Sequence, residues 1–427
     1  MTVTSLLTRW LWPETLAAWA YVSAPSPVPG LGRTSCVGGL LLHRFGRLAL
    51  ISAAAGSLAA AGIGTATAAP STHATSVRNT PVCSIPTTGL AACNAIRHDR
   101  VSADGKVVPN LIPAGYGPAD IKAAYGLGGG SGQTVAIIDA YDLPTAESDL
   151  GVYRSQYGLS ACTTANGCFR KVGQTGGTVP RANSGWGQEI ALDIDMVSAA
   201  CPGCHILLVE ATSATNANLA AAVNYAATQK VVAISNSYGG PDQAETSAYN
   251  HPGIAITAST GDSGYGVQSP ASGPHVIAVG GTSLNKVSGG YTQSAWSGAG
   301  SGCSTLNAKP TWQTKATSCS GKANADVSAV ADPNTGVAVY DSTPNHGSSG
   351  WLVFGGTSVS SPIIGSAYAL GGIHTDYPAA YTWVHTASLT DVTTGSNGTC
   401  PTAVWCTAGT GWDGPTGLGT PSGVGAF

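Results

Sequence analysis

The feature that most constrains the fold is a regular alternation of short apolar runs and longer helical stretches between residues 134 and 279. The apolar runs predict strands at residues 134–139, 206–210, 231–235, 254–258 and 276–279. The stretches between them predict helices at residues 145–157, 187–200 and 216–228. Because the strands are apolar on both faces, they favour a mainly parallel sheet with helices on both sides, an α/β fold of three layers.

The N-terminal part of the chain is typical of a targeting segment. Arg44 and Arg47 precede the apolar run at residues 48–64, which ends in the small residues expected of a cleavage site. We interpret residues 1–69 as a leader with a signal peptide and residues 1–40 as an upstream mis-called start. Residues 70–114 predict a short prosegment or linker, and residues 115–427 one compact domain. We therefore expect a secreted, extracellular protein with no membrane segment after signal removal.

The cysteines that follow the predicted leader also indicate an exported protein. Ten remain, in close sequential pairs that favour local bridges, although several connectivities stay open. The favoured pairs are Cys83–Cys93, Cys162–Cys168, Cys201–Cys204, Cys303–Cys319 and Cys400–Cys406.

The balance of charged residues narrows the classes of molecule that the protein is expected to bind. Residues 115–427 carry 10 Lys and Arg against 18 Asp and Glu. This acidic balance argues against nucleic-acid binding. We expect a monomer that acts on proteins or peptides.

A candidate nucleophile lies in Gly355-Gly356-Thr357-Ser358, ahead of a helical stretch of small residues at 363–370. The glycines permit a tight turn and close substrate approach, and a helix N-terminus favours negative charge near the serine oxygen. The alternative is an ordinary N-cap serine in a glycine-rich turn.

A serine nucleophile needs a base, and none of the nine histidines has a suitable context. Glu189 and Asp193 are four residues apart in the predicted helix at 187–200, so they share one face. Two like charges there cost stability unless something uses them. The alternative is a solvated helical edge to which Asp195 also belongs.

Two further segments end neighbouring predicted strands. Residues 259–264 contain Asp262, and residues 235–240 follow the preceding strand. The carboxyl ends of parallel strands meet at one edge of a sheet, where ligands bind. Either segment alone could be a glycine-rich turn.

Together these motifs resemble the sedolisin family over residues 115–427. The resemblance implies a subtilisin-like fold and peptidase activity at acidic pH. It makes Ser358 the nucleophile, Glu189 the base, Asp193 its partner and Asp262 the oxyanion-hole acid. It also implies pairing with the substrate main chain through Ser235, Ser237, Tyr238, Gly239 and Gly240.

The C-terminal residues 389–392 and 408–413 resemble the family's calcium site. Asp391 and Asp413 would supply carboxylates, and Val392, Gly409 and Gly411 main-chain oxygens, to one structural Ca²⁺. The alternative is a pair of unrelated turn aspartates.

Three other interpretations stay open. The first is a conventional Ser-His-Asp peptidase with Asp139 as the triad acid, and the second an inactive secreted binding protein on the same fold. The third reads Cys201-Pro-Gly-Cys204-His205 as a haem-attachment signature with Met196 as axial ligand. Family members commonly carry a large folded prodomain, whereas residues 69–114 are far shorter, which leaves activation open. The choice between endopeptidase and tripeptidyl-peptidase is open as well.

Overall fold

A computed structural model describes residues 76–130, 132–315 and 317–427. The predicted leader, residues 1–69, and the first residues of the predicted prosegment lie outside this range. In the described ranges no helix combines the length and the apolarity needed to cross a bilayer.

The central sheet has eight strands in the order β12-β11-β9-β7-β4-β6-β5, with β15 beside β11. All neighbours are parallel except β11 and β12. The strands are β4 (Thr134–Ala140), β5 (Phe169–Gly173), β6 (His205–Ala211), β7 (Ala233–Asn236), β9 (Ala255–Ser259), β11 (Ile277–Val287), β12 (Gly290–Ala295) and β15 (Val327–Val330). The five strands predicted from the sequence are confirmed, because their runs are apolar on both faces and buried.

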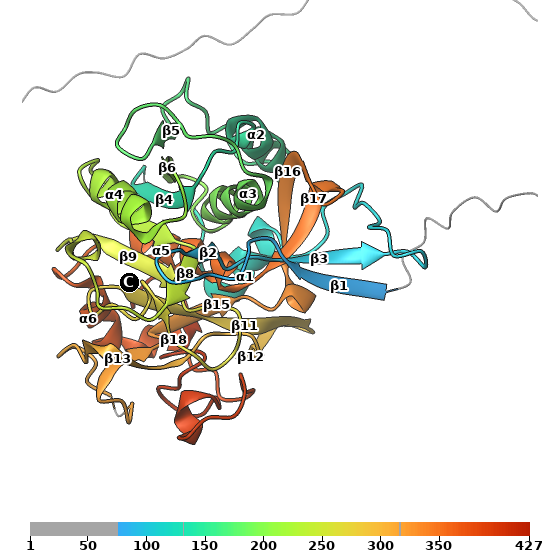
Figure 1. The fold of residues 1–427 in the computed structure, drawn as a ribbon. Coiled ribbons are helices and arrows are strands. Elements are labelled where there is room, and N and C mark those ends of the chain that lie inside the picture. The colour runs from blue at the N-terminus through green and yellow to red at the C-terminus, as the bar shows by residue number, and fades with distance from the viewer. Residues whose placement is uncertain (1–75, 131, 316) are drawn as a thin grey trace, which may run out of the picture. The chain divides into compact units, whose positions relative to one another are not determined.

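Helices cover both faces of this sheet, as the sequence predicts, and α3 and α4 lie on opposite sides of β4 and β6 (Figure 1). The helices are α1 (Pro118–Tyr125), α2 (Ala146–Gln156), α3 (Ser184–Ala200), α4 (Asn216–Ala227), α5 (Thr357–Gly371) and α6 (Pro378–Val384). Single turns of 3-10 helix occur at Ser247–Tyr249, Pro333–Thr335, Thr386–Ser388 and Ala403–Trp405. Because α2 and β16 pack outside α3, every residue of α3 from Trp186 onward is buried.

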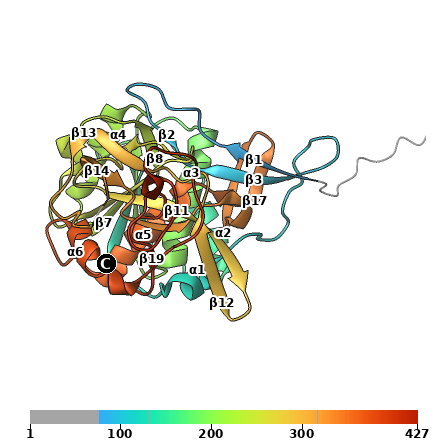
Figure 2. The ribbon, with the colours of Figure 1, turned by 90° about the horizontal axis from the view of Figure 1, so that it is seen from below.

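Residues before 115 join the same structure. A second sheet has the order β1-β3-β17-β16, and Figure 2 shows β1 and β3 alongside β17. Its strands are β1 (Ser76–Pro81), β3 (Ile96–Val101), β16 (Val337–Asn345) and β17 (Ser348–Gly355). A third sheet has the order β10-β8-β2, from β2 (Ala92–Cys93), β8 (Tyr238–Pro241) and β10 (Gln268–Ser269). Two-stranded pairs are formed by β13 (Gly302–Ala308) with β14 (Gly321–Asn324), and by β18 (Leu389–Thr390) with β19 (Thr420–Pro421).

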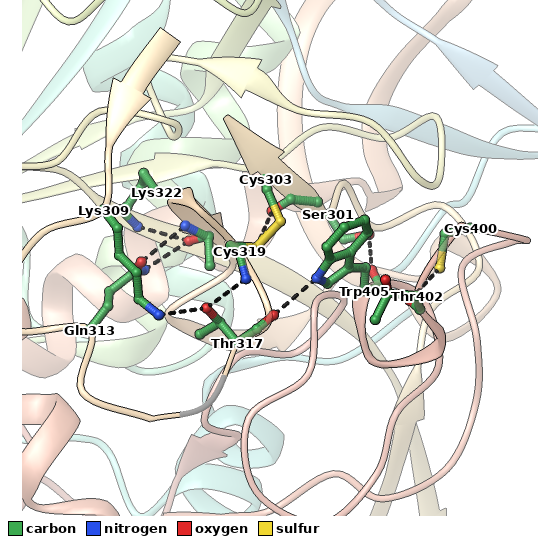
Figure 3. The surroundings of a disulfide bond; sticks show 12 residues. Ser301, Cys303, Lys309, Gln313, Thr317, Cys319, Lys322, Cys400, Thr402 and Trp405 are labelled. Carbon is green, nitrogen blue, oxygen red and sulfur yellow. Dashed lines mark hydrogen bonds between the residues drawn. A yellow bond between two sulfur atoms is a disulfide. The ribbon is translucent and has the colours of Figure 1, made fainter. Parts of the chain in front are cut away.

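The five sequential cysteine pairs are confirmed as disulfides. Cys201 and Cys204 are bonded to each other, so the haem-attachment interpretation is wrong. Figure 3 shows the Cys303–Cys319 bond, where the indole nitrogen of Trp405 donates to the carbonyl oxygen of Thr317 at 2.9 Å. The bridge therefore fixes a loop that also anchors the segment around residue 405.

Candidate active site

Ser358 is the second residue of α5, directly after the turn that ends β17. Gly356 in this turn has φ of 95°, a conformation that favours glycine, and a Cβ there would overlap the main-chain oxygen of Asn94. The Ser358 hydroxyl is buried and donates to the carbonyl oxygen of Ser237 at 3.0 Å. The serine thus lies at a helix N-terminus, where main-chain N–H groups favour negative charge.

Glu189 and Asp193 lie one turn apart on α3, and both are fully buried. Burial raises the pKa of Glu189 well above its usual range, and the charges of Asp193 and Asp139 raise it further. Burial and the charge of Asp139 also raise the pKa of Asp193 well above its usual range. In the described part of the chain neither forms an ion pair. Two carboxyl groups buried together without a cation retain at least one proton near neutral pH.

Two hydroxyl groups adjoin this carboxyl pair. Ser358 lowers the pKa of Glu189, and Ser237 lowers that of Asp193, because each hydroxyl can donate to the ionised form. Both hydroxyls instead donate to main-chain oxygens, Ser358 to that of Ser237 and Ser237 to that of Ser358 at 3.3 Å. A rotation of the Ser358 side chain would therefore replace the Ser237 carbonyl oxygen with the Glu189 carboxylate as the acceptor of its hydrogen bond.

The solvated-edge interpretation of α3 is wrong. Asp195, which that interpretation includes, is also fully buried, and it accepts a hydrogen bond from the main-chain nitrogen of Tyr340 at 2.9 Å. Tyr340 belongs to β16, which packs on the outer side of α3.

Asp262 follows β9 and is anchored to the residue before the serine. Its Oδ1 accepts from the main-chain nitrogen of Thr357 at 2.7 Å and from the Thr357 hydroxyl at 2.8 Å. Its Oδ2 is buried, and within the described chain nothing donates to it; a Cβ on Gly356 would lie 2.6 Å away. Burial raises the pKa of Asp262 to about 7. The protonated acid would thus direct an O–H group toward the start of α5.

The residues predicted to bind the substrate main chain lie at the end of β7 and in β8. Ser235 is buried, with its hydroxyl 2.9 Å from that of Ser361, and the Tyr238 hydroxyl donates to Asn236 at 2.7 Å. These two side chains therefore face the core. Ser237, Gly239 and Gly240 instead expose their main chain to the extended segment at residues 90–94, which contains β2.

Sequence reasoning assigned Asp139 only to a Ser-His-Asp triad. The structure places it at the end of β4, fully buried, with neither carboxyl oxygen hydrogen bonded within the described chain. Burial raises its pKa well above the usual range, and its charge raises those of Glu189 and Asp193. Among the described histidines none forms a hydrogen bond or an ion pair with Asp139. The signal was available, because an apolar strand that ends in an aspartate directs a carboxyl group to the carboxyl edge of the sheet.

Asp391 and Asp413 lie together around the loop at residues 409–411. The main-chain nitrogen of Gly411 donates to Asp391 at 2.8 Å, and that of Gly409 donates to Asp413 at 3.2 Å. Burial raises the pKa of Asp413 to about 7, the Asp391 charge adds to this, and neither has an ion-pair partner in the described chain. No described main-chain N–H donates to the carbonyl oxygens of Val392, Gly409 or Gly411. This oxygen-rich, uncompensated set fits a hard divalent cation.

Comparisons with known proteins agree with this geometry. Residues 177–412 match the model of the subtilase family. The chain is 31% identical to kumamolisin from Bacillus sp. (strain MN-32) over 74% of its own length and 63% of that protein. It is 28% identical to sedolisin from Pseudomonas sp. (strain 101) over 72% of its length and 60% of that protein. The chain thus spans less than two thirds of these curated relatives.

A solved structure gives the same result. The structure of Pseudomonas sedolisin, a serine-carboxyl proteinase complexed with pseudo-iodotyrostatin, matches with a TM-score of 0.62 and 27% identity. The match covers 73% of this chain and 96% of that one. On the family match, the relatives and the shared fold, this chain belongs to the subtilase family and, within it, to the sedolisin type.

Proposed function

We propose that the chain is a serine-carboxyl peptidase that hydrolyses peptide bonds at acidic pH through an acyl-enzyme on Ser358. One observation carries this proposal. A serine at a helix N-terminus adjoins buried carboxyl groups of raised pKa, with no cation or histidine of the described chain among them. Two interacting carboxyl groups lose their protons in separate steps, so the pair can present one carboxylate in acid, where a histidine base would already be protonated.

In the proposed reaction the Ser358 oxygen attacks the substrate carbonyl carbon while Glu189 accepts the hydroxyl proton. Asp193 shares the remaining proton of the pair and so keeps one carboxylate available as the base. The developing oxyanion accepts hydrogen bonds from the main-chain nitrogen of Ser358 and from the protonated Oδ2 of Asp262. Glu189 then donates its proton to the leaving amine, and a water molecule hydrolyses the ester.

The acidic working range follows from Asp262. A carboxylate has no proton to donate, so only the neutral acid can stabilise the oxyanion. With a pKa of about 7, Asp262 is neutral in acid and ionises as the pH rises through that value. The buried pair on α3 can serve as the base under such conditions because two interacting carboxyl groups lose their protons in separate steps, and between these steps the pair holds one proton and one carboxylate.

We also propose a structural calcium site held by Asp391, Asp413 and the main-chain oxygens of Val392, Gly409 and Gly411. A bound divalent cation would compensate the two carboxylates and restrain the loop that follows Asp391. The leader pattern and the paired cysteines support a secreted, extracellular protein, which we propose acts as a monomer on protein or peptide substrates.

The proposal is tested by release of peptides from a denatured protein at pH 4. Ser358→Ala should abolish turnover, while its melting temperature stays within a few degrees of wild type. Ser366→Ala is the matched control, because this hydroxyl lies in the same helix, is buried and makes no hydrogen bond within the described chain. The control should keep wild-type activity. Full activity in Ser358→Ala would end the serine-peptidase proposal.

A further inference from the structure

A second group of buried carboxyl groups lies on the outer side of α3. Asp149 of α2, Asp195 of α3 and Asp341 of β16 are all buried, and we call them the outer carboxyl cluster. The three elements pack against one another (Figure 1). The side chain of Asp149 lies within hydrogen-bonding reach of that of Asp341, and the charges of both act on Asp195. None of the three takes part in the proposed reaction.

The outer carboxyl cluster anchors the free edge of β16. This strand is the last of its sheet, so alternate main-chain N–H groups point away from β17. The main-chain nitrogen of Tyr340 donates to Asp195 at 2.9 Å, and that of Ser342 donates to Asp149 at 3.1 Å. Carboxyl groups of α2 and α3 thus take the place of a neighbouring strand.

The cluster has fewer donors than acceptors. Oδ1 of Asp195 and Oδ2 of Asp341 are buried, and within the described ranges nothing donates to either oxygen. Ionised carboxyl groups buried close together repel each other strongly, because little water screens them. A proton on one of them removes this repulsion and supplies an O–H donor for another. The cluster is therefore compensated while it holds protons and destabilised when it loses them.

The charged groups that face the cluster do not replace these protons. Arg154 of α2 acts on Asp195, but its three nitrogens donate to neutral oxygens, and it forms no ion pair with a carboxylate of the described chain. Tyr153 and Tyr157 also face Asp195, whose charge adds to burial in raising the pKa of each phenol. Asp120 of α1 acts on Tyr157 in the same direction. These surroundings favour the neutral, protonated form of the cluster.

The cluster also joins the two elements that carry the proposed catalytic groups. Glu189 and Asp193 belong to α3. β16 forms a hairpin with β17, whose end at Gly355 leads into the turn before Ser358. The outer carboxyl cluster thus connects the helix of the proposed base to the hairpin that precedes the proposed nucleophile.

We propose that Asp149, Asp195 and Asp341 hold the β16–β17 hairpin on α2 and α3 through shared protons, firmly in acid and less firmly as the pH rises. This role goes beyond the proposed reaction, because it acts on the fold and needs no substrate. Burial raises the pKa of Asp341 to about 7, and the charge of Asp149 adds to this. An unfolded Asp ionises near pH 4, so the stabilisation is complete below about pH 4 and is lost as the pH rises through about 7.

Asp341→Asn replaces the shared proton by a permanent donor. The amide oxygen can still accept from the main-chain nitrogen of Thr343, which donates to Oδ1 at 2.8 Å, and the amide nitrogen can donate in place of the partnerless Oδ2. With excess Ca²⁺ throughout, the melting temperatures of wild type and variant should agree within about 2 °C at pH 4. At pH 8 the variant should melt about 4 °C or more above wild type. A difference that is the same at both pH values would overturn the inference.

Glu210→Gln is the matched control. Burial also raises the pKa of Glu210 to about 9, but this side chain lies at the end of β6, where it accepts from the main-chain nitrogen of Leu143. Its effect on the melting temperature should add to that of Asp341→Asn at every pH. The effects of Asp149→Asn and Asp341→Asn should not add, because these two groups share a proton. Additivity in both pairs would contradict the shared proton.

Hydrogen exchange locates the change in the structure. In wild type the main-chain N–H groups of Tyr340 and Ser342 should lose at least about tenfold in protection between pH 5 and pH 8, corrected for intrinsic rates and relative to β6. Asp149→Asn keeps an oxygen acceptor for Ser342 and removes the charge that faces Asp341, so it should retain most of this protection; it also serves as the test variant if Asp341→Asn does not fold. Equal losses of protection in β16 and β6 would assign the pH dependence to the whole protein and overturn the inference.

Discussion

Replacement of Asp262 by asparagine separates the oxyanion acid from every other titrating group. The substitution keeps the shape of the side chain, and its amide oxygen can still accept both hydrogen bonds from Thr357. The amide nitrogen would take the place of the partnerless Oδ2 and donate at every pH. We expect Asp262→Asn to stay within about tenfold of wild type in acid, because an amide donates a weaker hydrogen bond than a carboxylic acid.

The pH profiles should then diverge. Because the pKa of Asp262 is raised to about 7, the competent acid is fully present well below that pH and is lost as the pH rises through it. Above pH 7 wild-type kcat/KM should fall tenfold per pH unit. One lost oxyanion donor is worth about a hundredfold to a thousandfold, so the decline should level off after about two to three pH units. Asp262→Asn should show no such limb.

The assay is kcat/KM for one peptide from pH 3 to 10, with the melting temperature measured at each pH. Asp341→Asn is the matched control: burial also raises the pKa of Asp341 to about 7, but this side chain faces Asp149 and Thr343 away from the active site. Asp341→Asn should retain the wild-type limb. If Asp262→Asn keeps the wild-type midpoint of the alkaline decline in kcat/KM, Asp262 is not the group that causes this decline. If the midpoint shifts in both Asp262→Asn and Asp341→Asn, the decline reflects the stability of the whole protein.

Two other outcomes can be measured directly. Glu189→Gln and Asp193→Asn should each lose most of kcat. The loss in the double variant should be far smaller than the product of the two single losses, because the pair acts as one unit. Multiplicative losses would contradict a shared proton. Chelation of divalent cations should lower the melting temperature of the wild type, since a cation at one hundred times its Kd adds about 2.7 kcal/mol to the free energy of unfolding. The melting temperature of Asp413→Asn should not respond to the chelator. Equal responses in the wild type and in this variant would reject the calcium site.

The parallel sheet could be predicted from the sequence because its strands are buried on both faces and separated by helices. The segments at residues 235–240 and 259–264 can likewise be assigned to one edge of that sheet, since parallel strands share their carboxyl ends, whereas only the family resemblance joins Glu189 and Ser358 to them. The predicted start of α3, at residue 187, lies three residues after the observed start at Ser184. Its N-cap is Asn183, which accepts from the main-chain nitrogen of Trp186 at 3.0 Å, and this polar first turn carries no apolar periodicity.

Pairings between distant segments could not be predicted. Residues 70–114 read as a polar linker, yet β3 pairs with β17, about 250 residues later. Main-chain hydrogen bonds make such contacts, so side-chain patterns reveal that a strand exists and not which strand lies beside it. The position of Asn94 at Ser358 was hidden for the same reason, as was the approach of Asp139 to the carboxyl pair on α3.

The disulfides described above have a consequence for how the protein regains its covalent structure. Each of the ten bonded cysteines is joined to the cysteine nearest to it in the sequence, and the largest separation is 16 residues. In a reduced, unfolded chain the entropic cost of loop closure rises with loop length, so these cysteines meet each other more often than any alternative partner. Random reoxidation is therefore biased toward the native set before any tertiary contact forms, and the reduced chain should need little help from an isomerase to recover it.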